Sequence, residues 1–465
     1  MAYEAIVTRI HTRPHPNADR LQLGTVHGHQ VVVGLETQDG ELGIFFPTDG
    51  QLSDSMCRCN SLYAFEAYAK LGEESPYPKE KCGFFSANRR VRAQSFRGEK
   101  SDGFWCPLSF LAWTNPADYL EGSLLALKEG DTFTAFNGQE ICCKYETPAT
   151  KRAQGKIGGK QRENHCFPKH DVTKQFRYVS ETIPEDAVIY ITEKLHGTSG
   201  RYGYVLDDVA LPWWKQLFNR FGSIFPEQQY RYLNGSKNVI LEKSTGGGYY
   251  GTNEFRYNAI EGVELHKGEV LYFEIIGEFV RERTWIDVNG KEVKESYTVA
   301  IMPPHPIKSE MKDVRKAYGE QMRYRYGLDD GQTDIYVYKI VRMNEDGIGV
   351  DLSWPQVVAR CSELGLKHVP LLAGPFSLSV RYPSHWDDGV YYADPVIRSY
   401  EIEKEVNDLT EGKSTLDVSH IREGIVLRVE SSRGIEYIKN KSWLFGVLEG
   451  YIKDNTEYVD MEEIS

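Results

Sequence analysis

The chain has 465 residues, with 67 acidic and 55 basic side chains and a formal net charge of −12. Hydrophobic residues make up 40% and charged residues 26% of it, which excludes a globally disordered or collagen-like chain. This length predicts two or three domains. The acidic balance argues against a protein that coats nucleic acid through bulk positive charge.

The sequence gives no indication of secretion or of a membrane span. We expect no secretory signal at the N-terminus, and the longest apolar run, residues 270–280, is too short for a span and contains Glu274 and Glu278. The eight cysteines include no C-x-x-C pair, so we expect reduced thiols and no zinc site. A cytoplasmic protein without a membrane partner is therefore predicted.

Residues 1–145 have the pattern of a β-rich domain. Strand-like runs at residues 4–10, 21–26, 30–35 and 42–47 are separated by clusters of turn-forming residues. Short strands at this spacing predict a small barrel or sandwich.

A basic segment follows at residues 146–180, and its Gly-, Lys- and Gln-rich start predicts a linker. Between residues 144 and 180 there are nine basic and three acidic side chains, although the whole chain is acidic. Residues 88–100 form a second basic stretch. We therefore predict three parts, namely residues 1–145, the linker 146–180 and residues 181–465.

Residues 181–465 mix strand-like runs with a few helices, as in an α+β domain. Apolar or alternating runs at 187–195, 270–278, 334–341 and 424–430 indicate half-buried or buried strands. Residues 354–366 predict a helix that ends at Gly365.

One lysine stands out among these runs. Lys194 ends an apolar strand-like run and is followed by Gly197, a residue that allows close approach to the backbone. A lysine placed among other cations loses its proton more readily and can then attack an electrophile. Taken alone, this pattern fits a solvated lysine at a strand end better than it fits a nucleophile.

The later strand-like runs supply further polar groups. Two carboxylates, two tyrosines and a lysine pair spaced by two residues occur there: Glu278, Glu423, Tyr336, Tyr338, Lys439 and Lys441. The period-2 spacing places both lysines of the pair on one face of a strand. Phosphoryl transfer from a nucleotide uses the same kinds of group. Cations bind the phosphates, carboxylates bind a metal or the ribose, an aromatic face binds the base, and a nucleophile attacks.

These motifs resemble a known family. In order along the chain, the segments around Lys194 and Gly197, Glu278, residues 336–340, Glu423 and residues 438–442 resemble motifs I, III, IIIa, IV and V of the covalent nucleotidyltransferases, which comprise polynucleotide ligases and mRNA-capping enzymes. His196 stands where DNA ligases and capping enzymes carry an aspartate, and residues 193–199 are similar to RNA ligases. Residues 15–34, 42–52, 91–108 and 129–148 resemble the N-terminal OB module of Deinococcus-type RNA ligases.

The resemblance implies an N-terminal OB-like β-barrel and a C-terminal adenylyltransferase domain with ATP-grasp-like antiparallel sheets and flanking helices. It also implies an ATP-dependent RNA ligase. Lys194 would attack the α-phosphate of ATP to form a lysyl-AMP, the AMP would pass to a 5′-phosphate RNA end, and a 3′-OH would displace it to seal the strand.

The resemblance further implies a role for each matching residue. Glu193 and Gly197 would line the adenosine pocket, and Tyr338 would stack on adenine. Glu278 and Glu423 would hold ribose or a divalent metal, Mg²⁺ or Mn²⁺. Three lysines would serve the nucleotide: Lys439 and Lys441 at the α-phosphate, and Lys237, which stands where many relatives carry an arginine.

Two departures and two alternatives stay open. Lys339 replaces an aspartate expected in motif IIIa, and residues 302–332 are an elaboration without an assigned role. A DNA ligase or capping guanylyltransferase could use the same lysine, and a noncatalytic RNA-binding protein could retain a decayed fold. The expected partner is RNA, and the expected oligomeric state is a monomer.

Overall fold

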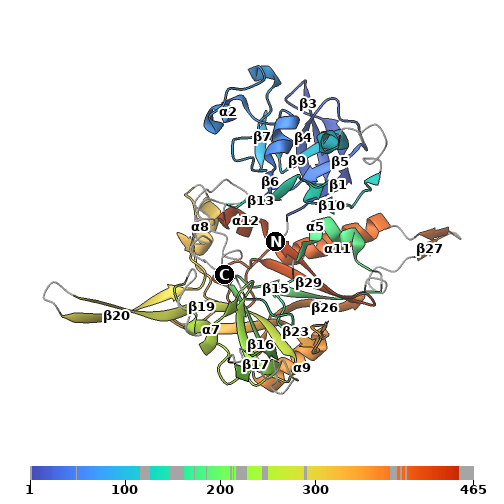
Figure 1. The fold of residues 1–465 in the computed structure, drawn as a ribbon. Helices are drawn as coiled ribbons and strands as arrows, with labels where there is room; N and C mark the ends of the chain where they lie inside the picture. The colour runs from blue at the N-terminus through green and yellow to red at the C-terminus, as the bar shows by residue number, and fades with distance from the viewer. Residues whose placement is uncertain are drawn as a thin grey trace. The chain divides into compact units, whose positions relative to one another are not determined.

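The structure is a computed structural model that describes residues 3–48, 50–115, 126–146, 162–171, 173–184, 186–209, 212, 214–215, 228–242, 250–286, 291–309, 311–377, 385–387, 390–392 and 395–449. It forms two compact units (Figure 1). The first comprises Met1–Pro148 with Glu449–Tyr458, and the second Ala149–Leu448 with Val459–Ser465. Residues 147–161 of the predicted linker lie outside the described residues.

Short strands dominate the first unit. A four-stranded sheet has the order β10-β1-β5-β9, a three-stranded sheet the order β2-β3-β4, and three further pairs are β13–β6, β11–β12 and β7–β8. The bounds of these strands are β1 Ala5–Arg9, β2 His11–Pro14, β3 Leu21–Val26, β4 His29–Gly34, β5 Leu42–Phe46, β6 Gly50–Leu52, β7 Gln94–Phe96, β8 Glu99–Ser101, β9 Phe104–Pro107, β10 Thr132–Phe133, β11 Ala135–Phe136, β12 Gln139–Glu140 and β13 Cys142–Lys144.

The predicted closed OB-like barrel is not confirmed. Among the described residues of this unit no sheet closes on itself. The helical segments α1 (Asp54–Cys59), α2 (Phe65–Leu71) and η1 (Lys79–Lys81) stand between β6 and β7, and η2 (Leu108–Thr114) follows β9. These segments interrupt the run of strands, and their apolar residues join those of the sheets in one buried cluster that includes Ile44, Met56 and Tyr68.

The second unit contains two largely antiparallel sheets. The five-stranded sheet has the order β14 (Lys174–Gln175), β30 (Gly434–Lys441), β29 (Gly424–Ser431), β15 (Val188–Lys194) and β26 (Leu371–Ser377). The eight-stranded sheet follows the path β18 (Ile240–Leu241), β17 (Gln228–Ser236), β16 (Thr198–Asp208), β19 (Glu269–Ile286), β23 (Thr333–Met343) and β24 (Gly349–Asp351). Strands β20 (Glu292–Ala300) and β25 (Lys367–His368) pair with β19 and β23.

In the described part of this unit, few helices accompany these sheets. They are α5 (Phe176–Val179), η4 (Ser180–Thr182), α7 (Glu254–Asn258), α8 (Lys312–Tyr318), α9 (Trp354–Leu364), α11 (Pro395–Thr410) and α12 (Trp443–Glu449), and two short strand pairs are β21 (His305–Pro306) with β22 (Gln321–Met322) and β27 (His385–Asp387) with β28 (Val390–Tyr392). Helix α9 confirms the helix predicted over 354–366, because Ser353 and Gln356 form a capping box and Gly365 ends the helix at a φ of 66°. The predicted mixed, sheet-rich architecture of this half is thus observed. No described helix is long and apolar enough to cross a membrane.

The two faces of the five-stranded sheet belong to different cores. On β15, Ile189 and Ile191 pack in a cluster with Ile402 and Val406 of α11. Tyr190, which points to the other face, belongs to the largest cluster, together with apolar residues of the eight-stranded sheet. The side chain of Lys194 continues the face of Tyr190, so it lies on the side of the five-stranded sheet that meets this shared core.

Part of the segment that was predicted as a linker packs on the eight-stranded sheet. Phe167 is buried, and its carbonyl oxygen accepts a hydrogen bond from Arg201 Nη1 at 2.8 Å. His170 Nδ1 lies 2.6 Å from the hydroxyl of Tyr338. The described residues 162–171 therefore cover β16 and β23.

Candidate active site

Strand register brings two lysines to one glycine. Lys194, the last residue of β15, pairs with Gly424 of β29, and Gly424 pairs with Lys441 of β30. Directly opposed residues of antiparallel strands point to the same face, so both lysine side chains lie on one side of the sheet. Lys439 pairs with Val426 two positions along and shares this face.

A buried carboxylate joins the two lysines. Glu423 Oε1 is 2.7 Å from Nζ of Lys194 and 3.0 Å from Nζ of Lys441, and its side chain is 2% exposed. Burial alone would raise the pKa of Glu423, but the two ammonium groups hold it well below its usual range. With Lys439 nearby, three lysines and one carboxylate leave net positive charge on this face, which suits a phosphate group.

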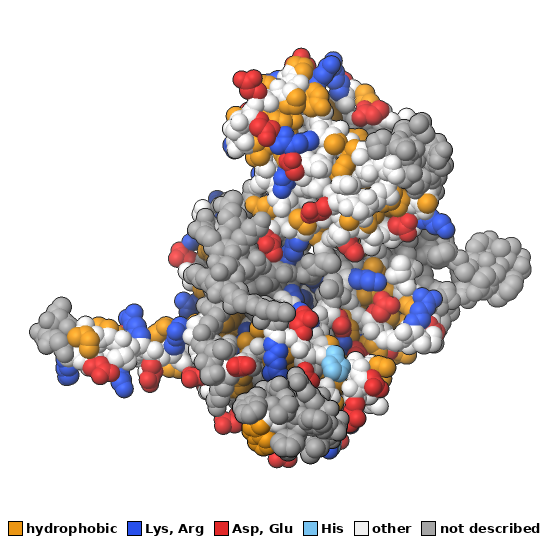
Figure 2. Space-filling view, in the orientation of Figure 1, with side chains coloured by type: hydrophobic (Ala, Val, Ile, Leu, Met, Phe, Trp, Pro, Cys, Tyr) orange, Lys and Arg blue, Asp and Glu red, His pale blue; other side chains and the backbone are white. Residues whose placement is uncertain are grey.

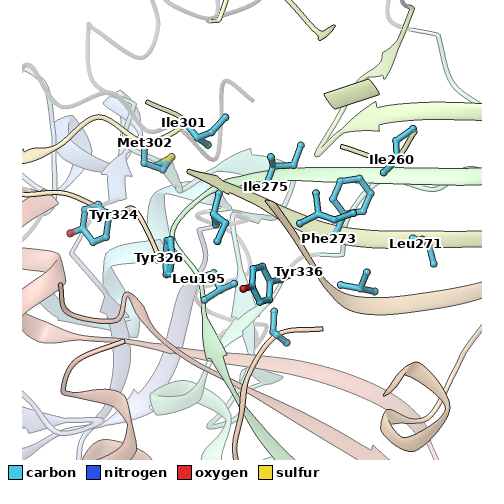
Figure 3. Packing of buried hydrophobic residues seen from close by; sticks show 14 of the residues in the cluster. Leu195, Ile260, Leu271, Phe273, Ile275, Ile301, Met302, Tyr324, Tyr326 and Tyr336 are labelled. Carbon is cyan, nitrogen blue, oxygen red and sulfur yellow. The ribbon is translucent and has the colours of Figure 1, made fainter. Parts of the chain in front are cut away.

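The three residues after Lys194 carry the chain from one sheet to the other. A Cβ on Gly197 would lie 2.3 Å from the carbonyl oxygen of Ile275 in β19, so close packing of the chain itself requires a glycine here. His196 donates its backbone N–H to the hydroxyl of Tyr326 at 2.5 Å. Leu195 belongs to the same buried cluster as Tyr326 and Tyr336 (Figure 3).

His196 itself is buried beside the carboxylate. Its Nδ1 is 3.6 Å from Glu423 Oε2, and burial lowers its pKa despite that neighbour. The imidazole is therefore neutral at physiological pH. The negative charge of Glu423 is neutralised by Lys194 and Lys441 and not by His196.

Glu193 has one satisfied and one unsatisfied oxygen. Its side chain is buried, and Oε2 accepts hydrogen bonds from the backbone N–H and the hydroxyl of Thr415 at 2.9 and 2.6 Å. Oε1 is buried without a hydrogen-bond partner among the described residues. Buried carboxylate oxygens are normally paired, so this oxygen is available to a polar donor of a ligand.

The other predicted site residues contact different groups. Glu278 lies on β19, 17% exposed, with Oε2 3.8 Å from Nη2 of Arg325. The hydroxyl of Tyr338 is engaged by His170, and the backbone carbonyl of Lys237 accepts a hydrogen bond from the same histidine.

Two residues of motif IIIa, Tyr336 and Lys339, differ in their surroundings. Tyr336 is buried in the same cluster as Leu195, and burial raises the pKa of its hydroxyl. Lys339, in place of the expected aspartate, forms ion pairs with Asp171 and with Asp351, the latter at 3.2 Å. Lys339 therefore fastens the segment before β14 to the sheet.

Sequence reasoning missed two residues that hold the candidate site in place. Tyr326 lies in the segment 302–332, which had no assigned role, and Thr415 follows α11. Neither stands in a periodic pattern or a motif, and only the fold brings them to residues 193–196.

Comparison with known proteins gives the family. Residues 187–443 match the sequence model of the RNA ligase family. No curated protein sequence is found to be similar. Among solved structures, Naegleria gruberi RNA ligase with PPi superposes with a TM-score of 0.51 at 15% identity over 96% of this chain and 97% of that chain. A mutant of that ligase with ATP and Mn gives 0.52 at 16% identity over 97% and 98%, and another with AMP and Mn gives 0.51 at 16% over 96% and 97%.

These structures share the fold with this chain along nearly its full length. The family match covers more than half of the chain, including Lys194, Glu423 and Lys441. The chain belongs to the RNA ligase family.

Proposed function

We propose that this protein is an ATP-dependent RNA ligase that joins a 3′-OH end to a 5′-phosphate end through a lysyl-AMP intermediate on Lys194. The observation that carries this proposal is the buried Glu423 carboxylate between Lys194 and Lys441. Membership of the RNA ligase family supports RNA as the substrate. The Naegleria gruberi ligase was solved with ATP and Mn, which supports the nucleotide and a divalent metal.

In the first step, Nζ of Lys194 would attack the α-phosphorus of ATP. An N–P bond forms, the bond from that phosphorus to the bridging oxygen breaks, and pyrophosphate leaves. Nζ loses two of its three protons to solvent, one before the attack and one after it, and keeps the third in the N–P linkage. Lys439 and Lys441 lie on the same sheet face and would offset the charge that develops on the phosphate oxygens.

Glu423 would hold the nucleophile in place before the reaction. An opposite charge at 2.7 Å favours the ammonium form of Lys194, whereas attack requires the free amine. Binding of a nucleotide therefore has to loosen this ion pair. A divalent cation, for which Glu278 and Glu423 offer carboxylate oxygens, would supply positive charge that competes for Glu423 and neutralises the phosphates.

The adenosine moiety would lie near Glu193, Gly197 and the aromatic residues of β23. The unpaired Oε1 of Glu193 can accept a hydrogen bond from the amino group of adenine, a group that guanine lacks at that ring position. Tyr336 lies in the same buried cluster as Leu195, so it joins Tyr338 as a candidate to stack on the base.

The remaining steps use the RNA ends. The AMP on Lys194 would pass to the 5′-phosphate, forming a 5′-5′ pyrophosphate linkage and releasing the lysine. The 3′-OH would then attack that phosphate, form the phosphodiester and release AMP. We assign residues 1–145 to RNA binding, by their resemblance to the OB module of Deinococcus-type ligases, and we expect a cytoplasmic monomer.

A sealing assay tests this function. Protein is incubated with 5′-phosphorylated, 3′-OH RNA strands, with ATP or GTP, and with Mg²⁺ or Mn²⁺, and the products are separated on a denaturing gel. ATP-dependent joining that Lys194→Ala abolishes and Lys308→Ala retains is the expected result. A covalent adduct formed only from GTP would indicate a capping enzyme, and RNA binding without any adduct would indicate a noncatalytic protein.

A further inference from the structure

Strands β19 and β20 continue beyond the sheet as an exposed two-stranded ribbon. The ribbon comprises residues 280–286 and 292–298, and Figure 1 shows β20 reaching away from the eight-stranded sheet. Its side chains include large apolar groups in contact with solvent, namely Trp285 at 40%, Ile286 at 65% and Tyr297 at 36% exposure. A two-stranded ribbon is only marginally stable alone, so exposed aromatic rings on it call for an explanation.

The two faces of the ribbon differ in chemistry. Register places Arg281 opposite Tyr297, Arg283 opposite Glu295 and Trp285 opposite Val293, so these six residues share one face, here called the aromatic face. The guanidinium of Arg283 lies 5.0 Å from the ring centre of Trp285 and 5.8 Å from that of Tyr297.

The opposite face carries no aromatic ring. It presents Val280, Glu282, Thr284, Ile286, Glu292, Lys294, Ser296 and Thr298. The aromatic face has two arginines and Glu295, a net charge of +1, whereas the opposite face has one lysine and two glutamates. Arg283 Nε donates to Glu295 Oε2 at 2.6 Å, and Arg281 Nη1 donates to the carbonyl oxygen of Tyr250 at 3.1 Å, so both guanidinium groups are held in place on this face. Charge and aromatic content thus distinguish the two faces. Basic, acidic and hydrophobic side chains are all visible along the ribbon in Figure 2.

We propose that the aromatic face binds single-stranded RNA several nucleotides away from the end that is being joined. This inference rests on the proposed ligase function. Exposed tryptophan and tyrosine rings stack on unpaired bases of any sequence, and arginine contacts both phosphates and aromatic planes. Double-stranded RNA fits less well, because its major groove is too deep and narrow for a ribbon.

The ribbon is connected directly to the candidate active site. Glu278, a proposed ligand for ribose or metal, pairs with Ala300 at the base of the ribbon, on the same strand as Trp285. Seven residues at about 3.3 Å each place Trp285 roughly 23 Å from Glu278. An RNA strand whose end occupies the site would therefore reach the aromatic face only if it extends several nucleotides from that end.

Paired variants on the two faces test the proposal. Trp285→Ala and Arg283→Gln alter the aromatic face, and Ile286→Ala and Lys294→Gln are matched controls on the opposite face. Binding of fluorescently labelled single-stranded RNA is measured by anisotropy, and lysyl-AMP formation with ATP alone is measured in parallel. We expect about 10-fold weaker binding of long strands for each aromatic-face variant, less than 2-fold for each control, and unchanged lysyl-AMP formation in all four.

Trp285→Tyr separates stacking from folding of the ribbon, because it keeps an aromatic ring and should bind RNA nearly as well as the unaltered protein. Equal losses on both faces, or no loss on either, would overturn the proposal. Absence of lysyl-AMP in the unaltered protein would instead overturn the proposed ligase function, whereas normal sealing with unchanged RNA affinity in the aromatic-face variants would reject the ribbon surface alone.

Discussion

Lys194 depends on side chains that are distant in the sequence. The sequence predicts Lys194, Glu423 and Lys441 as separate candidates, each in or beside a different strand-like run. Their contacts follow from the register of β15, β29 and β30, which is set by pairing over more than two hundred residues. A local pattern carries no information about such a register, so the ion pairs became visible only in the structure.

The role of Gly197 also changed in the structure. The sequence suggested that the glycine lets a ligand approach, and the structure shows that the backbone of β19 already occupies the place of a side chain. Both demands can act on one residue, but only the second follows from contacts within the chain.

At the scale of single residues, we predict that Tyr326→Phe slows the formation of lysyl-AMP. The substitution removes the oxygen that accepts the His196 N–H at 2.5 Å and keeps the buried ring. A hydrogen bond contributes about 1 kcal/mol, so we expect roughly a 5-fold lower kcat with a smaller change in KM for ATP. Single-turnover kinetics with labelled ATP measures both constants.

Tyr272→Phe is the matched control, because Tyr272 is also buried but belongs to a different apolar cluster, and its hydroxyl donates to the carbonyl oxygen of Pro168 at 2.9 Å. Similar rates for the two variants would contradict a specific role of Tyr326 in positioning the turn after Lys194.

At the scale of elements, β29 and β30 set the distance between the lysines. Gly424 stands between Lys194 and Lys441 with a φ of +154°, and a Cβ there would lie 2.2 Å from the carbonyl oxygen of Asn440. The backbone of β30 cannot move away without shifting Lys439 and Lys441. The sequence predicted the strand but not this close approach.

We therefore predict that Gly424→Ala disturbs both stability and the site. Backbone strain of this kind costs on the order of 1–3 kcal/mol, so the melting temperature should fall. The yield of lysyl-AMP should fall further than the folded fraction does. Gly434→Ala, at the first residue of β30, where an added Cβ would meet no atom within 4 Å, is a control for the general effect of a substitution at positive φ. Equal adduct yields per folded molecule in both variants would refute this account.

The N-terminal strands show what the alternation of apolar residues predicts and what it does not. Strand-like runs at 4–10, 21–26, 30–35 and 42–47 correspond to β1, β3, β4 and β5. The pattern could not predict whether these strands close into a barrel, because the helical segments between β6 and β7 have no strand periodicity. In the basic stretch 88–100, Arg89 lies 3.5 Å from Asp54 and Arg90 covers the ring of Tyr145 at 4.6 Å, so these two arginines serve internal contacts.

At the scale of the whole molecule, the acidic net charge coexists with local positive charge. Lys194, Lys439 and Lys441 gather on one sheet face, although the chain carries −12 in total. Net charge therefore describes the average surface and does not decide whether the protein acts on RNA.

Buried histidines predict how stability depends on pH. Burial lowers the pKa of His305 to about 3 and also lowers the pKa of His196 and His420. Below about pH 6.5 the unfolded chain binds protons that the folded chain does not, so stability falls as the pH drops from 7 toward 4, by at most about 1.4 kcal/mol per pH unit for each histidine. Glu423 adds a separate loss below about pH 4.5.

Melting temperatures at pH 7.5 and 5.5 check this expectation. His305→Gln should reduce the difference between the two temperatures, because glutamine does not titrate in this range. A difference that His305→Gln does not alter would contradict the assignment of His305 as a neutral buried group.

The central claim is that Lys194 is the nucleophile that receives AMP. Purified protein incubated with ATP and Mn²⁺, then digested and examined by mass spectrometry, locates the adduct directly. We predict one AMP on the peptide that contains Lys194, and none in Lys194→Ala, whereas Lys308→Ala is modified normally. An AMP on any other residue, or an adduct that persists in Lys194→Ala, would contradict the account.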